Sequence, residues 1–544
     1  MNALYYGDNL DVLRRHVKDE SVDLVYLDPP FNSNQGYNVL FAEHGGTRAA
    51  AQIKAFEDTW TWDESAARSY EDAVEAGGRV ADALLALRTF LGTSDMMAYL
   101  AMMAPRLSEL RRVMKDTASI YLHCDPTASH YLKVLMDAAF GPTNFRNEIT
   151  WKRRVGSSSA VHASRRFGTC TDIILFYAKT ADAPFFPQYN NTSEEYLKYV
   201  AERFKFVDSN GRTFRTDNLA NPALRPNLIY EYKGYKPPAN GWAISREKME
   251  QWDKEDRLYF PKSKDGRIAR KRFLDELKGM PIQNLWTDLA EINSQAQERL
   301  GYPTQKPLAL LERIIAASSK EGDVVLDPFC GCGTSIAAAE KMKRQWIGID
   351  VTHLAIGLIK SRLRDQFGDG IVGTYRVIGE PTTPDDAEEL AKTDPYQFQW
   401  WALGLVGARP SEQKKGADKG IDGRLFFHDE KGGDTKQIIL SVKAGKMHAN
   451  YVRDLRGVVE RENAAIGVLI SLDEPTQQMR TEAASAGFYV APYSGTKHPR
   501  MQLLTVAEIL GGKGIDYPAK GQMNVTIRRA PKAKGKDEKN RELF

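Results

Sequence analysis

A chain of 544 residues exceeds what one hydrophobic core usually serves, so its length predicts two to four domains. Its composition, 42% hydrophobic and 27% charged, is typical of a globular protein and excludes a fibrous or wholly disordered one. The formal net charge of +4 is confined to residues 528–544, which hold seven Lys or Arg and three Asp or Glu. Because the preceding chain is neutral, only local basic clusters can argue for nucleic-acid binding.

Membrane and secretory features are lacking in the sequence. No apolar run approaches the roughly 20 residues that cross a bilayer, and the first residues lack the basic start and apolar core of a signal peptide. We therefore expect a cytoplasmic protein without a membrane partner. The cysteines are too few and too scattered for a disulfide framework or a zinc site; they are Cys124, Cys170, Cys330 and Cys332.

Residues 1–180 alternate short apolar strands with amphipathic helices. A strand over residues 3–8 leads into the helix DNLDVLRRHV, capped by Asp8 or Asn9, and the apolar strand VDLVYLDPP ends in two prolines. Residues 43–95 are expected to form helical decoration. Beyond them, helical spacing in AYLAMMAPRLSELRRVMK and HYLKVLMDAAF alternates with the strands SIYLHCD, NEITWKR and DIILFYAK. Such βαβ alternation predicts a parallel sheet covered by helices.

The rest of the chain divides into segments of different character. Many turn residues between polar and aromatic positions predict a loop-rich insertion over residues 181–300. Strand and helix patterns return over residues 301–370, with the helix KPLALLERIIAAS and the strands DVVLDPF and QWIGID. We interpret residues 371–395 as a linker, residues 396–512 as a second, smaller α/β domain and residues 523–544 as a disordered basic tail.

The sequence DPPF at residues 28–31 directly follows an apolar strand. The exocyclic amino group of adenine or cytosine is a poor nucleophile, because its lone pair is delocalised into the ring. The carboxylate of Asp28 and the backbone carbonyl of Pro29, in a turn stiffened by Pro30, can accept hydrogen bonds from that group and hold its nitrogen nearer to tetrahedral geometry. Phe31 can stack on a base flipped out of a duplex. An ordinary strand-to-turn boundary is the alternative, since two prolines serve that purpose as well.

A second acidic strand end occurs in DVVLDPFCGCGTS. The strand ends at Asp327, and Gly331 and Gly333 form a turn in which backbone can approach a ligand closely. The spacing matches neither a dinucleotide-binding turn nor a phosphate-binding loop, so a nucleoside ligand without phosphate, such as S-adenosylmethionine, fits better. The next strand ends at Asp350, where doubly wound folds place an acceptor for ribose hydroxyls. A plain turn with a capping aspartate is the alternative.

Together these features resemble the amino-group DNA methyltransferases of the permuted type, in which the catalytic motif precedes the cofactor motif. The likeness covers approximately residues 1–370 and includes Gly7 with Asp8 and the element TQKP at residues 304–307. It implies a doubly wound, Rossmann-like methyltransferase sheet, a catalytic turn at residues 28–31 and S-adenosylmethionine as cofactor. The implied cofactor site consists of Asp8, Lys306, Asp327, Phe329, Gly331, Gly333, Thr334 and Asp350.

The family resemblance also implies a substrate. A leading Asp in the catalytic turn favours adenine and a leading Ser favours cytosine, so Asp28 favours the N6 position of adenine, with N4-cytosine as the alternative. Methylation of RNA or of a protein amide uses similar turns, but the long insertion between the motifs disfavours it. We expect a site-specific enzyme of a restriction-modification or related system, with a separate restriction subunit or a second copy of the chain as further partners.

Local basic clusters between the two motifs suit contact with double-stranded DNA. Phosphate contacts fix register while a few polar side chains read base edges, so basic residues interleaved with Trp and Tyr favour target recognition. A solvated basic face is the alternative. A later basic run, KDGRIARKR, occupies residues 264–272. The candidate DNA-binding residues are Lys152, Arg153, Arg154, Arg165 and Arg166.

Residues 396–512 resemble the Mrr-like restriction nucleases, in which an acidic residue enters one strand and a lysine leaves the next. The resemblance implies a metal ligand at Asp422 and a catalytic role for Lys443, with Mg²⁺ required only if the domain cleaves DNA. Those enzymes place Glu or Gln where this chain has Ser441, and a hydroxyl is a far weaker magnesium ligand than a carboxylate. The two alternatives are therefore a fused restriction nuclease, whose methyltransferase half protects self DNA, and a nuclease-like fold kept for binding.

Overall fold

The computed structural model describes residues 2–30, 61–153, 168–293, 296–300, 302, 304–410, 420–428, 435–492, 494–518 and 530–532. The chain divides into two compact units, which we call unit 1 and unit 2. Unit 1 holds Met1–Phe186 and Asn284–Phe544, and unit 2 holds Pro187–Gln283. Unit 2 therefore occupies most of the loop-rich segment expected at residues 181–300.

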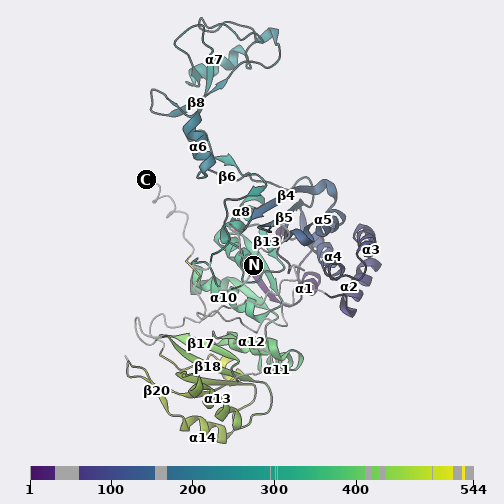
Figure 1. Ribbon diagram of the computed structural model, residues 1–544, viewed down its shortest axis with the longest axis vertical. Helices are drawn as coiled ribbons and strands as arrows, with labels where there is room; N and C mark the ends of the chain where they lie inside the picture. The colour runs from purple at the N-terminus through teal and green to yellow at the C-terminus, as the bar shows by residue number, and fades with distance from the viewer. Residues whose placement is uncertain are drawn as a thin grey trace. The chain divides into compact units, whose positions relative to one another are not determined.

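The large sheet of unit 1 has the strand order β12-β4-β5-β3-β2-β13-β14-β1-β15 (Figure 1). Strands from β3 through β15 in this order run parallel to their neighbours, whereas β5 is antiparallel to both β3 and β4. The strands are β1 (Asn2–Tyr6), β2 (Val22–Leu27), β3 (Met114–Cys124), β4 (Phe145–Lys152), β5 (Thr171–Ala178), β12 (Leu285–Trp286), β13 (Val324–Asp327), β14 (Gln345–Asp350) and β15 (Tyr375–Ile378).

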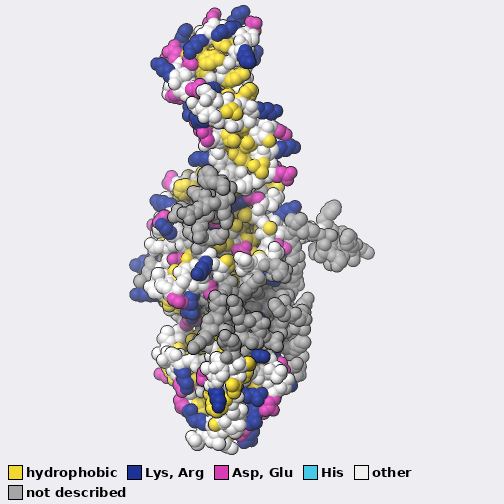
Figure 2. Space-filling model, turned by 90° about the vertical axis from the view of Figure 1, so that its left-hand side faces the viewer, with side chains coloured by type: hydrophobic (Ala, Val, Ile, Leu, Met, Phe, Trp, Pro, Cys, Tyr) yellow, Lys and Arg dark blue, Asp and Glu magenta, His cyan; other side chains and the backbone are white. Residues whose placement is uncertain are grey.

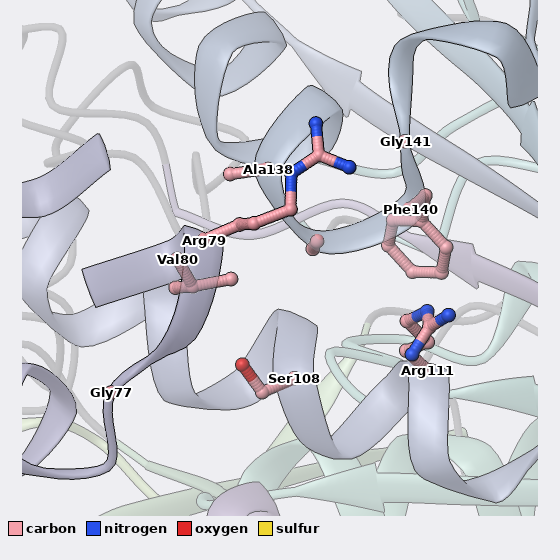
Figure 3. Close-up of a pocket in the computed structure, with 9 residues that line it drawn as sticks. Gly77, Arg79, Val80, Ser108, Arg111, Ala138, Phe140 and Gly141 are labelled. Atoms are coloured by element: carbon pink, nitrogen blue, oxygen red, sulfur yellow. The ribbon is translucent and has the colours of Figure 1, made fainter. Parts of the chain in front are cut away.

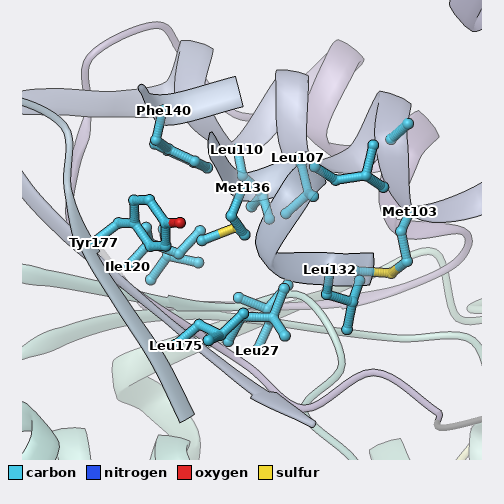
Figure 4. Packing of buried hydrophobic residues seen from close by; sticks show 14 of the residues in the cluster. Leu27, Met103, Leu107, Leu110, Ile120, Leu132, Met136, Phe140, Leu175 and Tyr177 are labelled. Atoms are coloured by element: carbon cyan, nitrogen blue, oxygen red, sulfur yellow. The ribbon is translucent and has the colours of Figure 1, made fainter. Parts of the chain in front are cut away.

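Both faces of the central strands are covered, as the fold class expected from the sequence requires. Alternate residues of a strand point to opposite faces. In β2, Val25 and Leu27 pack into a core with helices that include α4 and α5 (Figure 4), while the equally buried Leu24 and Tyr26 point to the other face. The helices of the sheet are α1 (Asn9–His16), α2 (Glu64–Glu75), α3 (Gly78–Leu91), α4 (Asp95–Val113), α5 (Pro126–Phe140), α8 (Leu308–Ser318), α9 (Thr334–Lys341) and α10 (His353–Phe367).

Strands β2 and β13 are direct neighbours, although about 300 residues of sequence lie between them in the chain. Leu326 pairs with Val25 in parallel register, so the carboxyl ends of both strands reach the same rim. Asp28 follows one of these ends and Asp327 forms the other. The two acidic strand ends found in the sequence therefore lie side by side, as expected.

The expected linker over residues 371–395 is wrong for most of its length. Strand β15 joins the sheet by pairing with the edge strand β1, with Val377 opposite Leu4. Helix α11 (Pro384–Thr393) follows, with Thr383 and Asp386 forming a capping box. The Pro and Asp residues that were interpreted as a linker are thus a helix start. In the expected tail, residues 530–532 are described, and the Ala530 N–H donates to Asp365 Oδ2 at 3.2 Å.

Unit 2 contains a small antiparallel sheet of order β7-β8-β10-β9 and a core around the fully buried Trp242. Figure 2 shows hydrophobic side chains among Lys and Arg on the surface of this unit, which is drawn at the top. The basic run at residues 264–272 is partly paired within the unit, because Arg272 Nε donates to Asp217 Oδ2 at 2.8 Å. The helices and strands of unit 2 are β6 (Tyr189–Asn190), α6 (Glu194–Arg203), β7 (Phe206–Val207), β8 (Thr213–Asn218), α7 (Arg246–Lys254), β9 (Leu258–Tyr259), β10 (Ala269–Phe273) and β11 (Met280–Pro281).

The C-terminal α/β part of unit 1 has a five-stranded sheet of order β16-β17-β18-β19-β22. Among the described residues, none of the helices combines the length and hydropathy needed to cross a bilayer. The elements are α12 (Pro395–Leu405), β16 (Arg409–Pro410), β17 (Gly423–Phe427), β18 (Lys436–Lys443), α13 (Asn450–Arg461), β19 (Ile466–Ser471), α14 (Gln477–Ser485), β20 (Phe488–Val490), β21 (Lys497–Pro499), β22 (Met501–Thr505) and α15 (Val506–Leu510).

Candidate active site

The acidic turn after β2 meets the TQKP element. Lys306 Nζ donates to Asp28 Oδ2 at 2.5 Å, and the side chains are only 12% and 15% exposed. An ion pair shielded in this way holds the carboxylate in one place. Pro29 and Pro30 follow directly, and Phe31 lies outside the described residues.

The glycine-rich turn after β13 is held from beneath by Asp327. This buried carboxylate accepts hydrogen bonds from the Phe329 N–H at 3.0 Å and from the hydroxyl of Ser335. Burial raises the pKa of Asp327 to about 7. Gly331 and Gly333 have φ values of +49° and +72°, a region that favours glycine. Asp327 therefore fixes the conformation of the turn, and the turn carries no side chain at Gly331 or Gly333.

Asp350 lies beside this turn at the end of β14. Its Oδ1 accepts from the Thr352 N–H and hydroxyl, both at 2.9 Å, and its Oδ2 accepts from the Gly331 N–H at 2.9 Å. A carboxylate oxygen has two acceptor positions, so Oδ2 can accept one more hydrogen bond from a ligand. Burial raises the pKa of this carboxyl to about 6.

The N-terminal GD element is tied to the same rim. The Gly7 N–H donates to the Asp350 carbonyl at 3.0 Å. Asn9 Nδ2 donates to the Pro328 carbonyl at 2.8 Å, and Arg106 donates to both Asp8 and Asn9 at 2.6 Å. The structure thus brings Asp8 to the site, although its side chain also caps α1. Sequence reasoning missed Asn9 and Arg106; the position of Asn9 next to the GD pair was the one available signal.

A buried arginine supports the glycine-rich turn from α10. Arg362 is 1% exposed, and its Nη1 donates to the Cys332 carbonyl at 3.1 Å and to Thr334 Oγ1 at 2.9 Å. The expected cofactor ligand Thr334 therefore faces Arg362. Nothing in the sequence pattern distinguished Arg362 from the other basic residues of its amphipathic helix.

The candidate DNA-binding residues are only partly described. Lys152 ends β4, and Arg153 follows it with Nε 3.3 Å from Asp172 Oδ1. Both lie at the same rim as Asp28, because β4 and β5 are antiparallel and the β5 residue Asp172 is near that end of β3. The remaining candidates, Arg154, Arg165 and Arg166, lie outside the described residues.

The expected nuclease residues meet in the C-terminal sheet. Asp422 Oδ2 accepts from Ser441 Oγ at 3.0 Å and from the Val442 N–H at 2.7 Å, while Gln399 Nε2 donates to Oδ1 at 3.2 Å. Lys443 Nζ lies 3.8 Å from Oδ2. Within the described part of the chain, no group of three His, Cys, Asp or Glu side chains could hold a metal ion. Among the described residues, the Asp422 carboxylate is thus occupied by the protein's own donors.

A cavity of about 320 Å³ lies among α3, α4 and α5 (Figure 3). Arg79, Arg111 and Phe140 are among its lining residues. Arg111 belongs to the last turn of α4, directly before β3 begins, whereas Asp28 lies beyond the carboxyl ends of the parallel strands. This cavity therefore lies at the rim opposite the acidic turns and plays no part in their chemistry.

The residues of the acidic rim fit a nucleoside cofactor. The turn from Cys330 to Gly333 has glycine at two of its four positions, and Asp350 offers a buried acceptor beside it. Such a cradle suits a ligand with ribose hydroxyls and without phosphate. An acidic Pro-Pro turn on the neighbouring strand adds an acceptor for an amino group. Fold and site together define the class of the S-adenosylmethionine-dependent amino-methyltransferases.

The comparison with known families agrees with this class. Residues 22–361, more than half of the chain, match the family model of the N6 and N4 methyltransferases, described as DNA methylase. The chain therefore belongs to this family, whose cofactor is S-adenosylmethionine. Residues 396–510 match a second model, described as NACHT-associated inactive Restriction Endonuclease 1. The resemblance of the C-terminal part to restriction nucleases is thus supported, and the matching family is described as inactive.

Relatives are found among type II and type III systems. The type II methyltransferase M.EcaI of Enterobacter cloacae is 28% identical over 377 residues, or 69% of this chain and 71% of that protein. The StyLTI Mod subunit, a type III restriction-modification enzyme of Salmonella typhimurium, is 28% identical over 363 residues. This match covers 63% of the chain and half of that subunit. The solved M1.HpyAVI complex with S-adenosylmethionine is 15% identical, with a TM-score of 0.31, and covers 67% of this chain and 99% of that one.

Proposed function

We propose that this chain transfers a methyl group from S-adenosylmethionine to the N6 nitrogen of adenine at a specific site in double-stranded DNA. The observation that carries the proposal is the parallel pairing of β2 with β13, which sets the Asp28 turn beside the cofactor turn. The leading Asp of the catalytic turn supports adenine over the N4 position of cytosine. Both bases present an exocyclic amino group, so the chemistry itself is the same for either.

The residues of the turn supply what this reaction needs. The cofactor, when bound, provides an electrophilic methyl group on its sulfonium. Asp28 and the Pro29 carbonyl accept hydrogen bonds from the amino group of the flipped base, which localises the nitrogen lone pair for attack. Lys306 holds the Asp28 carboxylate through their ion pair, and the fixed φ of Pro30 limits movement of the turn. Phe31 provides an aromatic face for stacking.

The cofactor-binding residues form a second group in the proposal. Asp350 would accept from a ribose hydroxyl through the acceptor position left on its Oδ2, beside the turn that holds Gly331 and Gly333. Asp8 and Lys306 complete the rim. We assign Asp327, Phe329 and Thr334 to the shape of the turn, because Asp327 accepts from the Phe329 N–H and the Ser335 hydroxyl and Thr334 accepts from Arg362.

We further propose that the chain works in a restriction-modification system together with a separate restriction subunit. The Mod subunits among its relatives support such a partner. A second copy of the chain is another proposed partner. Lys152 and Arg153, with the basic residues of the following segment, would contact DNA phosphates. The C-terminal part would not cleave DNA, because Asp422 already accepts from Gln399, Ser441 and the Val442 N–H, and Ser441 stands where the nucleases have Glu or Gln.

One reaction tests both halves of the proposal. Unmodified plasmid is incubated with the full chain, S-adenosylmethionine and Mg²⁺, and then examined for methylated nucleosides and for plasmid form. We expect N6-methyladenine and intact supercoiled plasmid. N4-methylcytosine would overturn the choice of base, and nicked or linear plasmid would restore the nuclease alternative.

The raised pKa of Asp350 makes cofactor binding pH-dependent. Protonation would remove an acceptor position of the carboxyl, so the Kd of S-adenosylmethionine should rise about tenfold between pH 7.5 and pH 5, centred on the pKa of about 6. The stability of the apoprotein depends on pH in the opposite sense. Because the folded-state pKa lies above the ordinary 3.8, Asp350 contributes stability below pH 4 that is lost as pH rises to about 6.

Calorimetric titration at several pH values measures this affinity. Asp350→Asn is the control, because the amide of Asn cannot ionise. The Kd of S-adenosylmethionine for this variant should therefore not change over the same pH range. An equal pH dependence in wild type and variant would show that another group is responsible.

A further inference from the structure

A buried chain of polar side chains leads to the catalytic turn. Tyr26 Oη lies 3.1 Å from His123 Nδ1, and His123 Nε2 lies 3.2 Å from Asp172 Oδ2. The three side chains are at most 2% exposed and come from β2, β3 and β5, which are neighbours in the sheet. Buried polar groups are costly unless they are satisfied, so a chain of three in a sheet core requires an explanation beyond packing.

The direction of each hydrogen bond follows from the donors present. The ionised carboxylate of Asp172 can only accept, so His123 carries its proton on Nε2. In the neutral imidazole, His123 Nδ1 is then an acceptor for the Tyr26 hydroxyl. The ring of Trp151 meets His123 edge-on, with centroids 5.7 Å apart, and helps to fix the imidazole plane. Every member of the chain therefore has a defined orientation.

Neighbouring charges keep Asp172, at the far end of this series of hydrogen bonds, ionised. Burial alone would raise the pKa of Asp172, but the hydrogen bond from His123 and the charges of Lys306 and Arg153 outweigh it and lower the pKa. Lys306 is also the partner of Asp28. Its ammonium group thus acts on both carboxylates, the one in the catalytic turn and the one in the buried chain.

The near end of the chain is two residues from the catalytic carboxylate. Tyr26 is the last residue but one of β2 and Asp28 follows the strand directly, so only Leu27 separates the two. Asp28 also raises the pKa of Tyr26 together with burial, which is the larger cause. Fixing the Tyr26 hydroxyl therefore fixes the strand end from which the Asp28 turn begins.

We propose that Tyr26, His123 and Asp172 are positioning residues that set Asp28 in its reactive orientation. This inference rests on the proposed methyltransferase function. None of the three would touch the base or the cofactor. They would act through Asp28, directly by way of β2 and indirectly by way of the shared Lys306. A displacement of a reacting group by about 1 Å can lower a rate by about 100-fold, so a small loosening is measurable.

The test compares two tyrosines that lie side by side on neighbouring strands of the sheet. Tyr26 pairs in register with Tyr121 of β3, whose Oη lies 2.6 Å from Ser318 Oγ of α8. Tyr26→Phe and Tyr121→Phe each remove one buried hydroxyl with its hydrogen bond and leave the ring in place. Single-turnover methyl transfer, the Kd of S-adenosylmethionine and the Tm are measured for both variants.

We expect similar losses of Tm and unchanged cofactor Kd in both variants. The methyl-transfer rate should fall about tenfold in Tyr26→Phe and by less than about twofold in Tyr121→Phe. Asp172→Asn, which keeps the acceptor but removes the charge, should lower the rate as well and shift its pH profile. Equal rates for the two tyrosine variants would overturn the inference. A wild-type chain with no methyl transfer to DNA would instead overturn the proposed function.

Discussion

Replacing Asp28 by alanine is expected to abolish methyl transfer, lowering kcat by at least about 1,000-fold. The carboxylate is the acceptor that localises the amino lone pair, and alanine leaves only the Pro29 carbonyl. The variant also leaves the buried ammonium of Lys306 without this partner, so a lower Tm is expected. Single-turnover transfer of labelled methyl groups to DNA measures the rate, and calorimetry measures cofactor binding, which should remain.

Asp23→Ala is the matched control for this prediction. Asp23 lies on the same strand and binds Lys115 Nζ at 2.8 Å, an ion pair like that of Asp28 with Lys306. It also accepts from the Val324 N–H at the opposite end of the strands. This variant should lose stability but keep its kcat. A fully active Asp28→Ala variant, or an equally inactive Asp23→Ala variant, would contradict the role of Asp28.

Replacing Gly333 by alanine should destabilise the chain by about 2 to 4 kcal/mol and raise the Kd of S-adenosylmethionine at least about tenfold. Gly333 has a φ of +72°, which strains any residue with a Cβ, and the new Cβ would stand 2.7 Å from Ile359 Cγ1. Relief of this overlap requires movement of α10 or of the turn. Either movement disturbs the backbone next to Asp350.

Gly357→Ala is the corresponding control on α10. Among the described residues, no atom outside the helix's own backbone and the two adjoining residues lies within 4 Å of the Cβ position at Gly357, and its backbone is helical. Alanine there should stabilise the helix by about 0.5 to 1 kcal/mol and leave the cofactor Kd unchanged. Thermal unfolding and cofactor titration of the two variants separate strain at the turn from a general effect of added methyl groups. The same response at both positions would contradict the assignment.

Much of the fold followed from local patterns. Apolar strands that end in Asp28, Asp327 and Asp350, with helices between them, were sufficient to predict a doubly wound sheet. The rule that parallel strands share a rim then placed these carboxylates together. The cap of α1 was predicted as Asp8 or Asn9 from neighbouring residues alone, and Asp8 forms it.

What could not be predicted depends on contacts between distant segments. Arg106 reaches Asp8 from a helix 98 residues further along the chain, and no local pattern marks it. No local pattern marks Arg362, which donates to the glycine-rich turn, or the hydrogen bond between His123 and Asp172. The strand at Tyr375–Ile378 was missed because four residues give too short a pattern, and its place depends on the free edge of β1.

The central claim is that the acidic turn after β2 and the glycine turn after β13 form one site. A crystal structure of the full chain with S-adenosylmethionine tests it most directly. We expect the ribose against Asp350 and the sulfonium methyl directed toward Asp28 across the rim between β2 and β13. A cofactor bound elsewhere, for example in the cavity among α3, α4 and α5, would contradict the claim.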